Sequence, residues 1–285
     1  MNSKLMKISF CDFWDGFDNH NNFFTQLLKS SDLVFDIVDV IDSPDVIFYS
    51  CFGELNKHFS CKKIFFTGEN FRPDINSNYS ITFDYDIKNN IRMPLWYMYI
   101  DWFNVGSYGN PGYLIPLSYL NQPNEFSIIK KNEFCVFMSN KAEYHRVNMF
   151  NTLNKRKRVD SYGSVFNNMG GKLGGTEKDK LEIISKYRFS IAFENSSYPG
   201  YNTEKLLHAK VVGNIPLYWG DPNIYNDMNP EAFLNFSNYK SFEEMVEHVM
   251  ELENNPSKRN DILNKPLFKE LPTIDLIKNQ LLEIL

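Results

Sequence analysis

Glu204 and Lys205 are adjacent at the predicted start of a helix, directly after a polar loop. The loop at 195–201 is rich in Asn, Ser, Pro and Gly, and the apolar run before it, at 188–193, predicts a buried strand. The first turn of a helix has free backbone N–H groups and a partial positive charge, to which a lysine adds a full charge. These residues therefore predict a phosphate site. A solvated helix also commonly carries a Glu-Lys pair in its first turn, so that alternative stays open.

A second candidate is Arg146, which lies one turn into the helix predicted at 142–155. This helix follows a predicted strand and a turn at 139–140. A guanidinium group at this place can reach back and form two hydrogen bonds to a diphosphate. From the sequence alone, a surface salt bridge explains this arginine equally well.

Glu69 is a third candidate because it comes directly after the strand predicted at 63–67. Open parallel sheets bind ligands outside the carboxyl ends of their strands, and a carboxylate at this place points toward such a site. A carboxylate there can act as a general base. Alternatively, Glu69 caps a turn or binds a hydroxyl group of a substrate.

Asp84 and Asp86 form a D-x-D motif, and two hard carboxylates at this spacing can hold Mn²⁺ or Mg²⁺. The motif is only three residues long. Alternating apolar residues from 81 to 87 put both aspartates on one face of a strand, so a solvated strand face explains them equally well. We therefore predict no metal site here.

The segment around Glu204 closely resembles the donor-binding signature of the α-1,3/1,4-fucosyltransferases, glycosyltransferase family 10. That signature contains Phe-Glu-Asn-Ser/Thr, then Tyr-x-Thr-Glu-Lys, an Ala in the helix, and Ile-Pro-x-x-x-Gly. The matching positions are 193–196, 201–205, Ala209, 215–216 and Gly220. The run Thr-Gly-Glu-Asn at 67–70 resembles a further segment of the same family. So many matches in fixed order make a chance resemblance improbable.

The resemblance implies roles for individual residues. Glu69 would be the general base that takes the proton of the acceptor hydroxyl. Arg146 and Lys205 would hold the diphosphate of the departing GDP, where charge develops in the transition state. Glu204 would bind ribose or fucose hydroxyls. The resemblance also places two loop residues in the donor pocket, namely Asn195 and Tyr201.

The implied reaction is transfer of L-fucose from GDP-fucose, with inversion, to a hydroxyl group of a GlcNAc-containing glycan. We expect the acceptor atom to be O3 and the setting to be glycan or lipopolysaccharide biosynthesis. No cofactor is expected beyond the donor substrate, because the two cations replace a divalent ion; stimulation by Mn²⁺ or Mg²⁺ is left open. Two alternatives remain, namely a transferase of the same fold with another nucleotide sugar, and a non-catalytic carbohydrate-binding protein.

Strand and helix signals alternate in both halves of the chain, which predicts an α/β fold with parallel sheets. Strands are expected at 7–13, 35–40, 45–50, 63–67, 81–86, 134–139, 159–162, 188–193, 215–219 and 232–236. Helices are expected at 21–29, around 55, and at 142–155, 177–187, 203–212, 241–252 and 273–284. Asn202 is the expected N-cap of the helix that carries Lys205, and Gly213 its end.

The resemblance implies a GT-B-like architecture, in which two Rossmann-like domains face each other across a cleft. We expect an N-terminal acceptor-binding domain at 1–125 and a GDP-fucose-binding domain at 126–265. A C-terminal helix at 266–285 is expected to cross the domain junction.

Composition limits the class of protein. The chain has 285 residues and a formal net charge of −5, so no strongly basic surface predicts nucleic acid as a partner. Four cysteines without C-x-x-C spacing predict reduced thiols in the core. No run of residues predicts a transmembrane helix. We therefore expect a soluble enzyme in the cytoplasm, with a peripheral place at the inner membrane face as an alternative. Animal members of the resembled family carry an N-terminal membrane anchor, so the resemblance implies an enzyme of bacterial or viral type.

Overall fold

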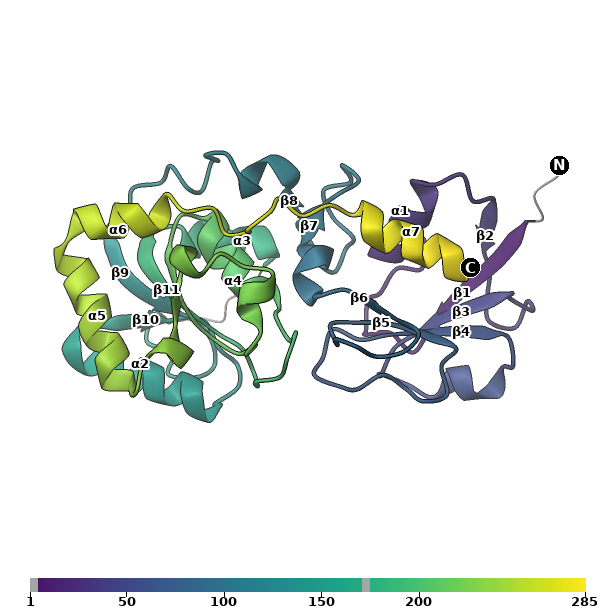
Figure 1. Cartoon of the computed structure of the whole chain (residues 1–285), viewed down its shortest axis with the longest axis horizontal. Helices are drawn as coiled ribbons and strands as arrows, with labels where there is room; N and C mark the ends of the chain where they lie inside the picture. The colour runs from purple at the N-terminus through teal and green to yellow at the C-terminus, as the bar shows by residue number, and fades with distance from the viewer. Residues whose placement is uncertain (1–4, 171–174) are drawn as a thin grey trace. The chain divides into compact units, whose positions relative to one another are not determined.

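The computed structural model describes residues 5–170 and 175–285, and these residues form two compact units (Figure 1). Unit 1 contains the chain up to Pro116 together with Thr273–Leu285, and unit 2 contains Leu117–Pro272. The division therefore comes before the boundary that the sequence placed between 125 and 126. The run at 167–175 is rich in glycine and predicts a loop, and its residues 171–174 lie outside the described residues.

Unit 1 is built on a six-stranded sheet with the order β2-β1-β3-β4-β5-β6, in which every pair of neighbours is parallel. Its strands are β1 Met6–Cys11, β2 Phe35–Ile37, β3 Val46–Tyr49, β4 Lys62–Phe66, β5 Tyr79–Thr82 and β6 Asn90–Arg92. A separate parallel pair consists of β7 Ile100–Asp101 and β8 Ile115–Pro116. The strands at β6, β7 and β8 were missed, since each has only two or three residues.

Alternate side chains of these strands enter two different cores. Phe10, Phe48 and Phe66 point to one face, where α1 Phe23–Lys29 and α7 Asp275–Ile284 pack. Residues between them, such as Ile47 and Phe65, form a smaller cluster on the other face. This period of two is what a parallel strand covered on both faces requires. The predicted C-terminal helix is thus part of unit 1.

Unit 2 is a second parallel sheet, with the strand order β10-β9-β11-β12-β13. Its strands are β9 Glu133–Phe137, β10 Val159–Ser161, β11 Tyr187–Phe193, β12 Ile215–Trp219 and β13 Leu234–Asn235. Its helices are α2 Tyr144–Arg156, α3 Glu177–Ile184, α4 Glu204–Val211, α5 Phe242–Asn254 and α6 Pro256–Leu263. All the carboxyl ends of these parallel strands lie at one edge of the sheet.

The predicted elements of unit 2 are confirmed with small shifts, and α6 is the helix that the sequence analysis missed. Most of α6 is exposed, and it lacks the apolar stripe by which α5 was predicted. The four cysteines are free thiols, as predicted, although only Cys11 and Cys135 are buried. No helix in the described part of the chain is both long and apolar enough to cross a membrane.

Candidate active site

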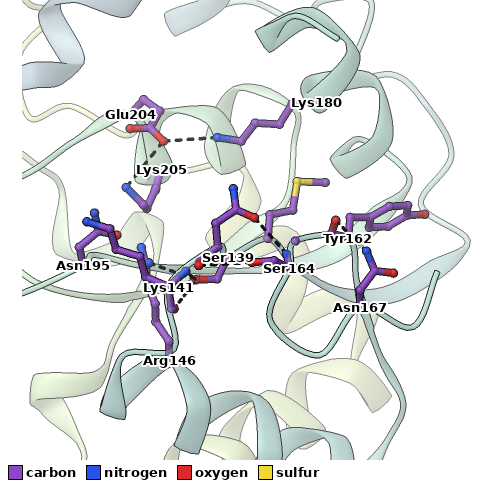
Figure 2. A pocket seen from close by; sticks show the side chains of 13 residues that line it. Ser139, Lys141, Arg146, Tyr162, Ser164, Asn167, Lys180, Asn195, Glu204 and Lys205 are labelled. Carbon is purple, nitrogen blue, oxygen red and sulfur yellow. Dashed lines mark hydrogen bonds and ion pairs between the residues drawn. The ribbon is translucent and has the colours of Figure 1, made fainter. Parts of the chain in front are cut away.

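A cavity of about 640 Å³ lies at the carboxyl edge of the unit 2 sheet (Figure 2). Its walls come from the segments after β9, β10 and β11 and from α2, α3 and the start of α4. The residues that line it are Met138, Ser139, Asn140, Lys141, Arg146, Tyr162, Gly163, Ser164, Asn167, Lys180, Asn195, Glu204 and Lys205. This is the edge at which open parallel sheets bind ligands.

The start of α4 is organised by Glu194, a fully buried carboxylate directly after β11. Its Oε1 accepts hydrogen bonds from the backbone N–H and the hydroxyl group of Thr203, at 2.8 and 2.9 Å. The N-cap residue is therefore Thr203, and the predicted N-cap at Asn202 is wrong by one residue. The Glu194 carboxylate, from another segment, holds both the N–H and the hydroxyl group of Thr203, and Thr203 is the extended residue directly before the helix.

Lys205 is held over this carboxylate. Its Nζ lies 3.0 Å from Glu194 Oε2 and 2.8 Å from Thr203 Oγ1, and 3.7 Å from the carboxylate of Glu204. Burial opposes the charge of Lys205, but the carboxylates of Glu194 and Glu204 outweigh it and raise the pKa of the ammonium group. Lys205 is therefore a permanent cation at the wall of the cavity.

Glu204 faces the cavity between two lysines, as Figure 2 shows. Lys180 Nζ lies 3.3 Å from its Oε1, so Lys180 and Lys205 both pair with this carboxylate. Although burial opposes ionisation, the charges of these two lysines hold the pKa of Glu204 well below its ordinary value. Glu204 is thus an anion that can accept hydrogen bonds from hydroxyl groups.

Arg146 is almost completely buried beneath the cavity. Its Nε and Nη2 donate to the carbonyl oxygen of Phe193, at 2.9 and 2.7 Å, and its Nη1 donates to Ser139 Oγ at 3.1 Å. Burial lowers the pKa of the guanidinium group, and Glu194 opposes this effect. The two-pronged contact predicted for a diphosphate is made here to a backbone carbonyl, which fixes the guanidinium group in place.

The structure gathers four of the predicted unit 2 residues around one cavity, namely Arg146, Asn195, Glu204 and Lys205. Tyr201 is different, because its side chain is buried and does not line the cavity. Its place in the donor pocket stays a prediction.

The site also contains three residues that were not predicted from the sequence. Lys141 and Lys180 line the cavity, and Glu194 supports it from below. Glu194 lies inside the recognised signature, so that motif could have indicated it. No sequence pattern distinguishes Lys180 from its neighbours on α3.

Glu69 lies in unit 1 in the loop after β4, as predicted. Its backbone N–H donates to Thr67 Oγ1 at 3.0 Å, and its carbonyl oxygen accepts from the N–H of Phe71 at 2.7 Å. The side chain is half-buried. The Glu69 carboxylate forms no hydrogen bond or ion pair with any residue in the described ranges, so both of its oxygens can accept a proton.

The D-x-D motif does not form a solvated strand face. Strand β5 ends at Thr82, and the side chain of Asp84 beyond it is only 1% exposed. One of its oxygens pairs with Arg72, and the other accepts from Thr82 Oγ1 at 2.7 Å. Within residues 5–170 and 175–285, no group of three or more His, Cys, Asp or Glu side chains is placed to hold a metal ion.

Two family models match the chain, one in each half. Residues 8–99 match the α-(1,3)-fucosyltransferase FucT N-terminal domain, and residues 128–262 match the C-terminal domain of glycosyltransferase family 10 (fucosyltransferase). The two models together therefore cover most of the chain and both of its units.

Similar proteins come from bacteria, viruses and animals. The α-(1,3)-fucosyltransferase FucT of Helicobacter pylori is 31% identical over 245 residues, which are 77% of this chain and 50% of that protein. A putative fucosyltransferase of Acanthamoeba polyphaga mimivirus is 32% identical over 48% of this chain and 24% of its own length. The chain thus spans half or less of these relatives.

Solved structures show the same fold. An α1,3-fucosyltransferase crystallised with GDP-fucose has a TM-score of 0.76 and 24% identity, with 98% of this chain and 90% of that chain covered. Anabaena HepE, crystallised with UDP and glucose, has a TM-score of 0.54 and 9% identity. The fold is the GT-B-like α/β fold that the resemblance implied. The chain belongs to glycosyltransferase family 10, the fucosyltransferase family.

Proposed function

We propose that this protein is an inverting fucosyltransferase that moves L-fucose from GDP-fucose to a hydroxyl group of a glycan. The observation that supports this most is the charge of the unit 2 cavity. Among the residues that the structure describes, four cations line it, namely Lys141, Arg146, Lys180 and Lys205, against the one carboxylate of Glu204. Such an excess of positive charge beside a helix N-terminus favours a diphosphate.

In the proposed reaction the acceptor oxygen attacks C1 of the fucosyl group while the bond from C1 to the diphosphate oxygen breaks. Glu69 takes the proton of the acceptor hydroxyl, a role worth roughly 10²–10⁴ in rate. GDP leaves with a new negative charge, which Lys205 and Arg146 stabilise. Because both cations are held by the protein before the reaction, little reorganisation is needed when that charge develops. A single displacement inverts the configuration at C1.

Glu204 has a separate role in this proposal. Its pKa lies well below the ordinary value, so it stays ionised and accepts hydrogen bonds from the hydroxyl groups of ribose or fucose. Lys180 and Lys205 keep the carboxylate in place from two sides. Asn195, which lines the same cavity, adds an amide group that can donate or accept.

We propose O3 of a GlcNAc unit as the acceptor atom. Relatives from several mammals, the human one at 28% identity over 50% of this chain, are named 4-galactosyl-N-acetylglucosaminide 3-α-L-fucosyltransferase 9. These names support transfer of fucose to O3 of the GlcNAc unit. A role in glycan or lipopolysaccharide biosynthesis, a reaction without an essential metal and a cytoplasmic location stay predictions.

The proposal is tested by product formation. Purified protein is incubated with GDP-fucose, or with UDP-glucose or UDP-galactose, and with a set of N-acetyllactosamine and N-acetylglucosamine glycosides, in the presence of EDTA. We expect a fucosylated product and GDP from GDP-fucose alone. UDP release would favour another nucleotide sugar, and glycan binding without any product would favour a carbohydrate-binding protein.

The role of Glu69 is tested in the same assay. Glu69→Gln keeps the size of the side chain but removes the basic oxygen, so kcat for transfer should fall by roughly 10²–10⁴ while the affinity for GDP stays near that of the wild type. Loss of GDP binding instead would mean that Glu69 is a donor ligand and that the base lies elsewhere.

A further inference from the structure

The loop that carries Glu69 is held by an ion pair shortly after Glu69. Arg72, three residues after Glu69, pairs with the buried carboxylate of Asp84, from the D-x-D motif that was considered as a metal site. We propose that Arg72 is a positioning residue, which holds this loop so that the Glu69 carboxylate keeps one orientation. This inference rests on the proposed role of Glu69 as the general base.

One guanidinium group joins two segments of unit 1. Besides its contact with Asp84, Arg72 donates from Nη2 to Asn70 Oδ1 at 2.5 Å, and it lies 5.0 Å from the centre of the Phe83 ring. Asn70 is the immediate neighbour of Glu69. The planar fork of an arginine can serve two acceptors in different directions, whereas a lysine offers a single charged point.

The backbone on the other side of Glu69 has little freedom. Thr67 Oγ1 accepts from the Glu69 N–H, and a Cβ atom added to Gly68 would come within 2.6 Å of Leu95 Cδ1. The loop is therefore held by β4 and Thr67 before Glu69, and by Arg72 after it. Loss of the Arg72 contacts would loosen the second side, where the bond from the Phe71 N–H to the Glu69 carbonyl oxygen and that from the Tyr49 hydroxyl to Asp74 remain. The Glu69 carboxylate would then have a wider range of orientations, since it has no hydrogen-bond partner of its own within the described ranges.

The burial of Asp84 determines which variant can test this proposal. The Asp84 carboxylate is almost inaccessible to solvent, so removal of Arg72 alone leaves a buried charge whose one remaining side-chain partner in the described part of the chain is Thr82. Breaking one side of a buried pair is strongly destabilising, whereas removal of both charges costs much less. The informative variant is therefore the double change Arg72→Met with Asp84→Asn, which removes the ion pair without leaving an unpaired charge in the core.

The experiment is a mutant cycle that compares four proteins: the wild type, the Arg72→Met, Asp84→Asn variant, Glu69→Gln, and the protein with all three changes. We measure kcat for transfer from GDP-fucose, the Kd for GDP and the Tm of the full-length protein. We expect the double variant to lower kcat about tenfold or more, because misplacement of a catalytic group by ~1 Å can cost ~10²-fold. In the Glu69→Gln background the same change should not lower the residual kcat further, and the Kd for GDP should stay unchanged throughout.

Arg92→Met is the matched control. Arg92 also holds the segment after β5, by donating to the hydroxyl group of Tyr85 at 2.8 Å and lying 4.1 Å from the centre of its ring. We expect this variant to lower the Tm without a change in kcat as large as that of the double variant.

Two results would overturn the proposal. One is an unchanged kcat in the Arg72→Met, Asp84→Asn variant. The other is a loss of kcat by the same factor with and without Glu69→Gln, which would make the pair a structural contact only. Failure of the proposed function has a different signature: Glu69→Gln alone would keep wild-type turnover, which would remove the base and the positioning role together.

Discussion

The unit 2 cavity is lined mainly by cations and lies next to a buried carboxylate. Glu194 lies beneath, fully buried, and Lys205 lies above it at 3.0 Å. A buried carboxylate usually reduces the positive charge that a neighbouring lysine offers to a ligand. Here the cavity stays cationic because Lys141, Lys180 and Arg146 line the same space. Glu194 therefore orients Lys205 without cancelling the field that a diphosphate needs.

Lys205→Ala removes the cation at the start of α4. We expect kcat/KM to fall by ~10²–10³, the usual effect of losing one group that stabilises charge in the transition state. Steady-state kinetics with GDP-fucose measures this, with circular dichroism to check that the variant is folded. A variant that keeps wild-type turnover would refute the role of Lys205.

Lys180 and Lys178 lie on the same helix and provide a matched comparison. Lys180 lines the cavity, whereas the Lys178 side chain is 47% exposed and its Nζ lies 3.8 Å from the carboxylate of Glu125. We expect Lys180→Met to weaken GDP binding by about tenfold or more, since a hydrogen bond to a charged group is worth ~1.5–3 kcal/mol. Lys178→Met should leave the Kd unchanged. Calorimetric titration measures both, and equal effects would show that only the overall charge matters.

His208, on α4, makes the stability of the protein depend on pH. Burial and the charge of Lys180 lower the pKa of His208 from 6.5 to about 3, so the folded protein holds it neutral. Below pH 6.5 the unfolded chain binds a proton that the folded chain does not, and the free energy of unfolding falls as the pH decreases. The slope from this residue is at most about 1.4 kcal/mol per pH unit.

Urea unfolding between pH 4.5 and 6.5 tests this prediction. The wild type should lose stability toward the acidic end of this range, and His208→Leu should show a smaller loss. The same pH dependence in both proteins would mean that other groups cause it.

At the scale of elements, α4 is fixed at both ends. Its start is held by Glu194 through Thr203 and Lys205. At its end, Asn124 Nδ2 donates to the carbonyl oxygen of Val211 at 3.0 Å, and Gly213 adopts a left-handed φ of +79°. A helix of only 8 residues gains little stability by itself, so these contacts set the direction in which its first turn points.

Gly213→Ala should destabilise the protein by more than the ~1–2 kcal/mol that left-handed backbone costs an ordinary residue. The added Cβ would lie 3.3 Å from the carbonyl oxygen of Ser127. Gly16→Ala is the control, because Gly16 has a φ of +78° and no atom of the described residues lies within 4 Å of its Cβ position. Urea unfolding gives both free energies. A smaller cost at Gly213 than at Gly16 would contradict this account of the helix end.

At the scale of the whole molecule, unit 1 is completed by the C-terminal end of the chain. Leu281 of α7 is fully buried in the core of unit 1, whereas Leu276 of the same helix is 67% exposed. We expect Leu281→Ala to lower the free energy of unfolding by ~2–5 kcal/mol, the usual cost of emptying a core position. Leu276→Ala should change it by no more than about 0.5 kcal/mol. Thermal and urea unfolding measure the difference, and equal costs would show that α7 does not stabilise the unit.

Much of this organisation could be predicted from the sequence, because buried parallel strands are continuous apolar runs. The strand at Ile215–Trp219 was predicted with its observed bounds. Short or exposed elements could not be predicted, since β6 has three residues and α6 has no apolar stripe. Contacts between segments that are distant in the sequence could not be predicted either. Glu194 holds the start of α4 at Thr203, and Arg72 pairs with Asp84, a buried aspartate that was expected on a solvated strand face.

The central claim is that the cavity of unit 2 binds the diphosphate of a nucleotide sugar. A crystal structure of the full chain with GDP tests this most directly. We predict the diphosphate in the cavity, within hydrogen-bonding distance of Lys205 and Arg146 and close to the backbone N–H groups at the start of α4. GDP bound elsewhere, with this cavity empty, would contradict the account.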